Sequence, residues 1–106
     1  MKSYVRNKTL YFIPEENLVS ENLMEHRDLM LKKLKKPSSF KDIVFNFKSV
    51  NSIDSGGISL LIGLRKEISP LDKTLKIIEL DESLTKVFNI FNLNELIETE
   101  QEETLS

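Results

Sequence analysis

The sequence of 106 residues contains no cysteine. Thiol catalysis, thiolate metal sites and disulfide bonds are therefore excluded, and the absence agrees with a reducing cytosol. No segment approaches the ~20 consecutive apolar residues of a membrane span, and the apolar run near the amino terminus is too short for a secretory signal. From these absences we expect a cytoplasmic protein that is not inserted in a membrane.

An excess of charge of one sign is also missing. Fifteen basic residues stand against 17 acidic ones, so the formal net charge is −2. No global field draws the chain to nucleic acid, and we expect its partners to be proteins. The length and a hydrophobic content of 40% fit one compact domain.

Support for catalysis is missing around the most conspicuous tetrapeptide, Asp54-Ser55-Gly56-Gly57. The same four residue types surround the nucleophile of chymotrypsin-like proteases, but a serine nucleophile needs a base such as histidine, oriented by a carboxylate. The only histidine, His26, falls within a predicted helix among charged residues, where we expect it to be solvated. There is no nucleophile elbow, phosphate loop, dinucleotide fingerprint or zinc helix. A small serine hydrolase is the weakest alternative, and we expect no catalytic, cofactor or metal site.

Strand-like and helix-like segments alternate along the chain. Runs of β-branched, aromatic and aliphatic residues predict strands, and apolar residues at helical spacing predict helices. Alternation favours an α/β fold, which here means a small mixed β-sheet with amphipathic crossover helices packed against it. The predicted strands cover residues 3–6, 9–13, 42–47, 74–80 and 96–99, with the first two paired across Asn7-Lys8. The predicted helices cover residues 19–36, 56–68 and a segment around 84–91.

The helices carry apolar stripes that we expect to face the sheet. We expect one domain over residues 1–99, followed by an acidic, flexible tail over residues 100–106. For Ile90 and Leu93, exposure near a partner surface stays open. The stripes contain Val19, Leu23, Met30 and Leu34 in the first helix and Leu84, Val87, Phe88 and Phe91 in the last.

Asp54 and Ser55 stand where a strand gives way to a helix. Both residue types are favoured N-caps, because their side-chain oxygens accept hydrogen bonds from the first turn, typically worth ~1 kcal/mol. Capping does not explain Gly56 and Gly57, since each glycine in a helix costs about 1 kcal/mol relative to alanine. The absent Cβ atoms allow another backbone or a kinase active site to approach the Ser55 hydroxyl closely.

The stretch DIVFNFKSVNSIDSGGISLLIGLRKEI, residues 42–68, resembles the central signature of the STAS domain, the family of anti-sigma factor antagonists. The shared features are a buried strand, a short turn, Asp-Ser, small residues and an amphipathic helix. The order of elements is similar across nearly the whole chain, including the segment ELDESLTKVFNIFNLNELIE at residues 79–98. The resemblance implies a STAS-like single domain of the α/β class that acts as a protein-binding module.

In this family the serine after the aspartate is phosphorylated by a serine kinase with a histidine-kinase-like ATPase fold, which is also the anti-sigma factor. The resemblance implies Ser55 as that serine, an anti-sigma factor as partner and a phosphoserine phosphatase for the reverse step. An alternative is a STAS scaffold subunit of a transport or signalling complex that is never phosphorylated. The partner-binding residues that the resemblance implies are Asp54, Ser55, Gly56, Gly57, Ile58, Asn17 and Ser20.

The sequence departs from the family pattern at several positions. Glu16 and Val19 stand where many members have a glycine and an aspartate before the first long helix. Gly56 replaces a frequent second serine or threonine, and Ser59 stands where glycine is common. The last two changes exchange small residues, so the close approach to Ser55 is expected to survive.

Overall fold

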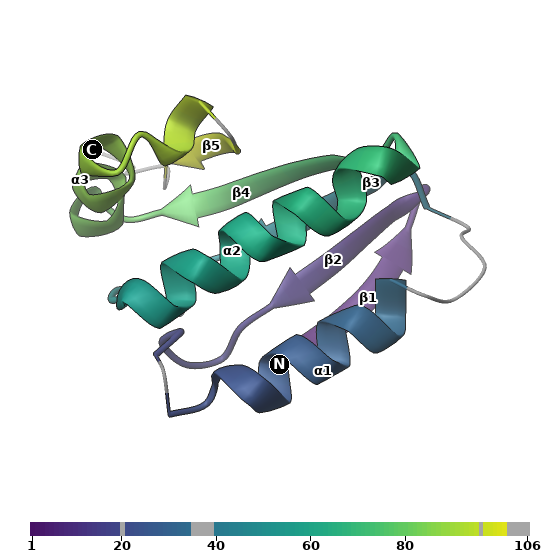
Figure 1. The fold of residues 1–106 in the computed structure, drawn as a ribbon, viewed down its shortest axis with the longest axis horizontal. Coiled ribbons are helices and arrows are strands. Elements are labelled where there is room, and N and C mark those ends of the chain that lie inside the picture. The colour runs from purple at the N-terminus through teal and green to yellow at the C-terminus, as the bar shows by residue number, and fades with distance from the viewer. Residues whose placement is uncertain (20, 35–39, 96, 102–106) are drawn as a thin grey trace.

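The structure is a computed structural model that describes residues 1–19, 21–34, 40–95 and 97–101 (Figure 1). Its centre is a five-stranded sheet in the order β1-β2-β3-β4-β5. The strands are β1 (Lys2–Arg6), β2 (Thr9–Ile13), β3 (Asp42–Asn46), β4 (Thr74–Leu80) and β5 (Glu98–Gln101). The helices are α1 (Leu23–Leu34), α2 (Ser55–Ile68) and α3 (Glu82–Ile90), with short 3-10 turns at Ser69–Leu71 and Leu93–Glu95.

The first two strands form a hairpin, as predicted. Asn7 and Lys8 both have positive φ angles, 51° and 63°, which is the conformation that a two-residue hairpin turn requires. Across this pair, Tyr4 and Tyr11 lie opposite each other and their rings stack with centroids 4.8 Å apart. Only β1 is antiparallel to its neighbour, and the remaining pairs are parallel. The sheet is therefore mixed, as the alternation of elements predicted.

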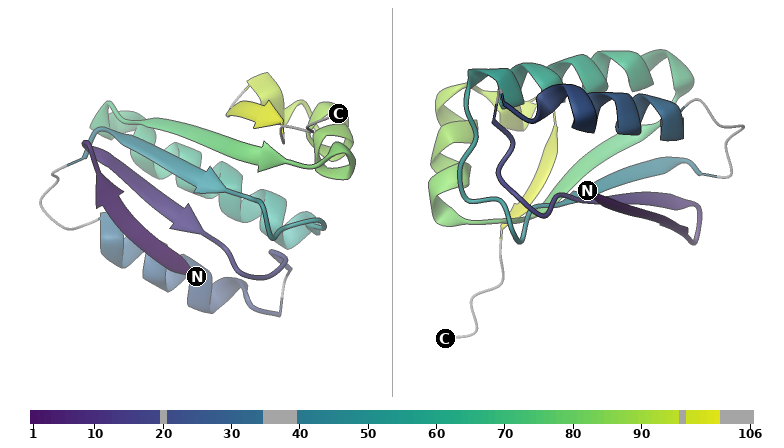
Figure 2. Two further views of the ribbon diagram at one scale, coloured as in Figure 1. Left: turned by 180° about the vertical axis from the view of Figure 1, so that it is seen from behind. Right: turned by 90° about the horizontal axis from the view of Figure 1, so that it is seen from below.

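Two helices cover one face of the sheet. Figure 2 shows α1 and α2 side by side over this face, while α3 stands at the end of the sheet where β4 finishes. The strands alternate accordingly, since Leu10 and Phe12 in β2 and Ile43 and Phe45 in β3 are buried under the helices. Phe12 and Phe45 stack across neighbouring strands with ring centroids 5.1 Å apart. This packed layer fixes the position of α2 relative to the carboxyl ends of the parallel strands.

The first helix is shorter than predicted. It begins at Leu23 rather than at residue 19, because Leu18 forms an isolated bridge with Ile53 and the Asn22 side chain accepts a hydrogen bond from the Val19 amide at 3.3 Å. Its described end is Leu34, and the last two residues of the predicted helix, 35–36, lie outside the described residues. The buried face of the helix contains His26, Met30 and Leu34.

The carboxyl-terminal segment differs from the predicted stripe at one residue, and it decides the two positions that the sequence left open. Leu84 and Phe88 are buried, but Phe91 is 58% exposed because α3 ends at Ile90 and the chain turns through Asn92, whose φ angle is 55°. Leu93 is 1% exposed and belongs to the core, so it is not a surface residue. Ile90, by contrast, is 74% exposed.

The last strand also lies slightly later in the chain than predicted. It spans Glu98–Gln101 and therefore runs two residues past the expected domain boundary at residue 99. The Lys76 ammonium group contacts the Glu100 carboxylate at 2.9 Å, which ties this strand to β4. Of the predicted flexible tail over residues 100–106, all but the first two residues lie outside the described part of the chain.

Candidate functional site

The junction between β3 and α2 is built around the Asp54 side chain. Asp54 has extended backbone angles, and its Oδ1 atom accepts a hydrogen bond from the Gly57 amide at 3.0 Å. Its carbonyl oxygen accepts the first helical hydrogen bond, from the Ile58 amide, also at 3.0 Å. These contacts define Asp54 as the N-cap of α2. The sequence allowed either Asp54 or Ser55 to be the N-cap, and in the structure it is Asp54.

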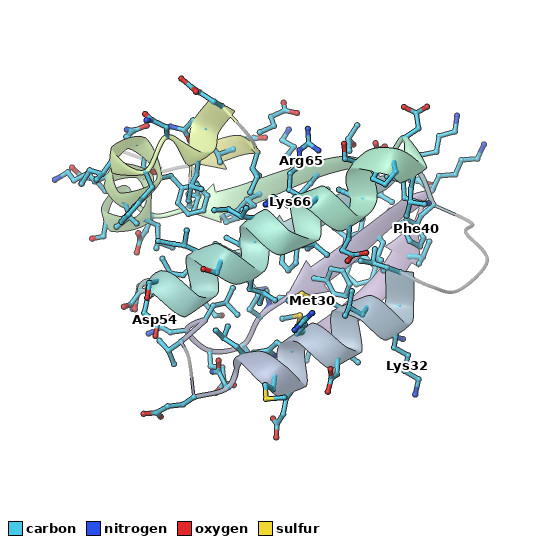
Figure 3. All side chains as sticks on the ribbon, viewed as in Figure 1. Met30, Lys32, Phe40, Asp54, Arg65 and Lys66 are labelled. Carbon is cyan, nitrogen blue, oxygen red and sulfur yellow. The ribbon has the colours of Figure 1, made fainter. Side chains whose placement is uncertain are left out.

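Ser55 is the first residue of α2 and is exposed. Its hydroxyl makes no hydrogen bond among the described residues, because the neighbouring aspartate already caps the helix. The hydroxyl also lies at the amino-terminal end of a 14-residue helix, where the partial charge of the helix dipole is positive. Figure 3 places Asp54 at this end of α2, which is the end of the sheet where β4 finishes and α3 stands. The junction therefore combines an accessible hydroxyl with a helix terminus that favours an anion.

Asn17 holds the adjacent loop in place. Its Oδ1 atom accepts hydrogen bonds from the amides of Asn51 at 2.9 Å and Ser52 at 3.2 Å. These bonds tie the turn after β2 to the segment that leads into α2, and the parallel bridge between Leu18 and Ile53 follows directly. Asn17 was assigned to the partner surface by resemblance, and the structure places it beside the loop of Ser55, where its side chain supports the site.

The close approach at Gly57 comes from the chain itself. A Cβ atom on Gly57 would lie 2.4 Å from Cγ1 of Ile53 and 2.5 Å from the carbonyl oxygen of Leu18. Contacts this short do not occur, so only glycine fits. Gly57 is buried, and of the two approaches that its missing side chain was expected to allow, the structure shows that of another backbone, at Leu18. A glycine at position 57 is needed for α2 to pack against the turn after β2.

The other predicted contact residues occupy different environments. Gly56 is half-buried, next to Ser55, whereas Ile58 is 8% exposed and packs into the hydrophobic core. The Ile58 side chain therefore offers little surface to a partner. Ser20 lies outside the described residues.

His26 is buried rather than solvated, contrary to the expectation from its charged neighbours. It is 6% exposed on the sheet-facing side of α1, and its Nε2 atom lies 3.2 Å from Oε1 of Glu16. Glu16 comes from the turn after β2, ten residues earlier, and this distance along the chain conceals the pairing in the sequence. The imidazole links α1 to this turn, and no hydrogen bond within the described part of the chain joins it to Ser55.

Metal clusters and membrane spans are both absent from the described residues. No group of three or more His, Asp or Glu side chains there is arranged to hold a metal ion. No helix in the same part of the chain has both the length and the apolar character needed to cross a bilayer.

Comparison with known protein families matches residues 2–105 to the STAS domain. None of the curated proteins matches the chain significantly. The fold is shared with solved structures of low sequence identity. A candidate anti-sigma factor antagonist from Thermotoga maritima aligns with a TM-score of 0.86 and 19% identity, covering 98% of this chain and 86% of the other.

Two other solved structures show the same fold. The anti-sigma factor antagonist SpoIIAA, in its unphosphorylated form, aligns with a TM-score of 0.71 and 16% identity, covering 97% of this chain and 88% of that one. A sulfate transporter family protein from Wolinella succinogenes aligns with a TM-score of 0.76 and 13% identity, covering 92% and 80%. The family match over nearly the whole chain and the shared five-stranded fold confirm the resemblance seen in the sequence: this chain belongs to the STAS domain family.

Proposed function

We propose that this chain is a cytoplasmic anti-sigma factor antagonist, a binding module and not an enzyme, whose contact with an anti-sigma factor is switched off by phosphorylation of Ser55. The observation that carries the proposal is the exposed Ser55 hydroxyl, which has no hydrogen-bond partner among the described residues. The similarity of the fold to anti-sigma factor antagonists supports the same assignment.

A phosphate on Ser55 is compatible with the folded chain. It adds about −1.5 to −2 charges at pH 7 and three acceptor oxygens. At the amino terminus of α2 this charge meets the positive end of the helix dipole, an interaction worth typically 0.3–1 kcal/mol at an exposed site. Because Asp54 already supplies the cap, the serine hydroxyl can be modified without loss of the first helical hydrogen bonds.

A docked partner would tolerate the phosphate poorly. An interface shaped for a hydroxyl beside Asp54 would have to desolvate the added charge, and the penalty for burying an ion is several kcal/mol. Since ~1.4 kcal/mol corresponds to a tenfold change in affinity, a fraction of that penalty is enough to release the partner.

The proposed partner is an anti-sigma factor that is also a serine kinase with a histidine-kinase-like ATPase fold. The kinase would transfer the γ-phosphoryl group of ATP to the Ser55 oxygen, with loss of the hydroxyl proton and release of ADP. A phosphoserine phosphatase would hydrolyse the ester and restore the binding form. The state of one side chain would then control the supply of free sigma factor.

A pull-down with an anti-sigma factor from the same genome tests the proposal. Unmodified protein and the Ser55→Ala variant are expected to recover the partner equally, and Ser55→Asp is expected to recover at least tenfold less, because its carboxylate carries part of the phosphate's charge. Circular dichroism confirms that all three variants are folded. Equal recovery by all three would contradict a switch at this residue.

A further inference from the structure

A groove of about 370 Å³ lies between α1 and α2, on the helical side of the molecule. Figure 3 shows Met30 between the two helices, and its exposed fraction of 1% places it at the floor of the groove. Leu64 is also buried, whereas Met24 is 78% exposed at the rim. Most of the lining is therefore aliphatic or thioether surface from both helices.

The α2 wall of the groove is formed partly by small residues. Gly56, Ser59 and Gly63 line it at intervals of three and four residues, and these intervals keep them on one side of the helix. Apart from its two chain neighbours and the backbone of its own helix, no atom lies within 4 Å of a Cβ atom placed on Gly63. Unlike Gly57, Gly63 therefore has open space in front of it, and internal packing does not explain why glycine stands there.

The groove is continuous with the Ser55 site. It begins at Gly56, the residue after Ser55, and extends along α2 to Glu67. These eleven residue steps correspond to about 16 Å along a helix axis, or about three turns. A partner that covers Ser55 is therefore adjacent to the open end of an apolar groove.

The rim carries charges of both signs. Arg27 on α1 and Glu67 on α2 are exposed, both line the groove, and neither forms an ion pair among the described residues. An occupant with one acidic and one basic side chain flanking an apolar stripe would complement this pattern. A simple anionic lipid would meet repulsion from Glu67.

We infer that this groove binds an amphipathic helix of about three turns from the partner protein, with apolar residues at i, i+3, i+4 and i+7 facing Met30 and Leu64 and with opposite charges near Arg27 and Glu67. The inference rests on the proposed function, because it extends the same binding surface from Ser55 along α2. A second copy of the chain fits less well. Its large exposed apolar residues among those described, Tyr4, Val5, Met24, Leu71, Ile90 and Phe91, form no stripe of three helical turns.

The first test uses a defined probe, so that it does not depend on the identity of the partner. The probe is a stapled 15-residue helical peptide with leucines at the four stripe positions, flanked by one glutamate and one lysine. The control peptide has the same composition with the stripe shuffled. Titration into the isotope-labelled full chain is expected to give saturable amide chemical-shift changes at Gly56, Ser59 and Gly63 with the striped peptide alone.

Matched variants locate the binding. Gly63→Trp is expected to fill the groove, because the space at its Cβ position is open, and to weaken the striped peptide at least tenfold. Lys66→Trp places the same side chain at an exposed residue of α2 that does not line the groove, and it is expected to stay within twofold of the unmodified chain. Thermal unfolding confirms that both variants are folded.

The inference is overturned if the shuffled peptide binds equally, if Gly63→Trp binds the striped peptide normally, or if no saturable shifts occur. Shifts at the same residues produced only by decanoate, or by raising the protein concentration alone, would assign the groove to an acyl chain or a second copy instead. The Ser55 pull-down is independent of this titration. If the pull-down fails but the striped peptide binds, the proposed function is contradicted and the helix-binding groove is supported. If the pull-down succeeds but the peptide does not bind, only the helix-binding groove is contradicted.

Discussion

At the scale of single residues, the side chains of Asp54 and Ser55 stand in different environments. The aspartate closes the first turn of α2 through the Gly57 amide, and the serine hydroxyl next to it is exposed. This division allows a charge to be added to Ser55 without removal of the helix cap. The two residues should therefore differ sharply in their effect on stability.

We expect Asp54→Ala to lower the free energy of unfolding by about 1 kcal/mol, because the Gly57 amide loses its acceptor. Asp54→Asn, which keeps a side-chain oxygen, should lose much less. Ser55→Ala should stay within about 0.5 kcal/mol, as an exposed substitution. Urea denaturation followed by far-UV circular dichroism measures all three. A larger loss from Ser55→Ala than from Asp54→Ala would reverse the assignment of the cap.

Asn17 is expected to order the loop before the site. Asn17→Ala removes the acceptor of two backbone amides, those of Asn51 and Ser52, at a cost of about 1–2 kcal/mol. Amide hydrogen exchange at Asn51 and Ser52 should become faster in this variant, while Asn17→Asp, which keeps the acceptor, should preserve most of the protection. Unchanged exchange in Asn17→Ala would show that these bonds do not hold the loop.

At the scale of elements, α2 contains two glycines whose surroundings are opposite. Gly57 is pressed against the Leu18 carbonyl and the Ile53 side chain, whereas the space beside Gly63 is open. One glycine is required for the packing of the helix on the turn after β2. The other weakens the helix and leaves the groove between α1 and α2 unfilled.

The same substitution should therefore have opposite signs at the two positions. Gly57→Ala is expected to destabilise the chain by about 1–3 kcal/mol, because a backbone carbonyl stands where the methyl group would go. Gly63→Ala should stabilise it by up to about 1 kcal/mol through helix propensity. Chemical denaturation of the two variants in parallel measures the difference, and two changes of the same sign would contradict the observed packing.

The contact between β4 and β5 should depend on pH. The hydrogen bond and charge of the Glu100 carboxylate raise the pKa of Lys76 above its usual value of 10.5. Because the raised pKa belongs to the folded state, the contribution to stability is present below pH 10.5 and is lost as the pH rises through the higher value. The stability difference between the unmodified chain and Lys76→Met should therefore be constant from pH 7 to 9 and shrink above 10.5. A stability difference that grows above pH 10.5 would contradict the predicted direction of the pH dependence.

At the scale of the whole molecule, the regular elements could be predicted because their patterns are local. The parallel strands β3 and β4 and the helix α2 follow apolar runs and helical spacing, and their observed bounds differ by at most one residue from those predicted. The Asn7-Lys8 turn was likewise readable, since a short polar pair joined two strand-like runs.

Features that depend on distant parts of the chain were not predictable. The burial of His26 needs Glu16 from the turn after β2, and the requirement for glycine at Gly57 comes from the Leu18 carbonyl. The exposure of Phe91 depends on where α3 stops, which helical spacing alone does not determine. In the site itself, Ser55 was identified from the local motif, whereas the groove beside it required the pairing of two helices.

The most direct measurement of the central claim is intact-protein and peptide mass spectrometry of this chain isolated from the cells that make it. We predict a fraction carrying one phosphate, located on Ser55 by fragmentation, and its loss after treatment with a phosphoserine phosphatase. A chain that remains unmodified at Ser55 under all growth conditions, or that is phosphorylated at other residues only, would contradict the account.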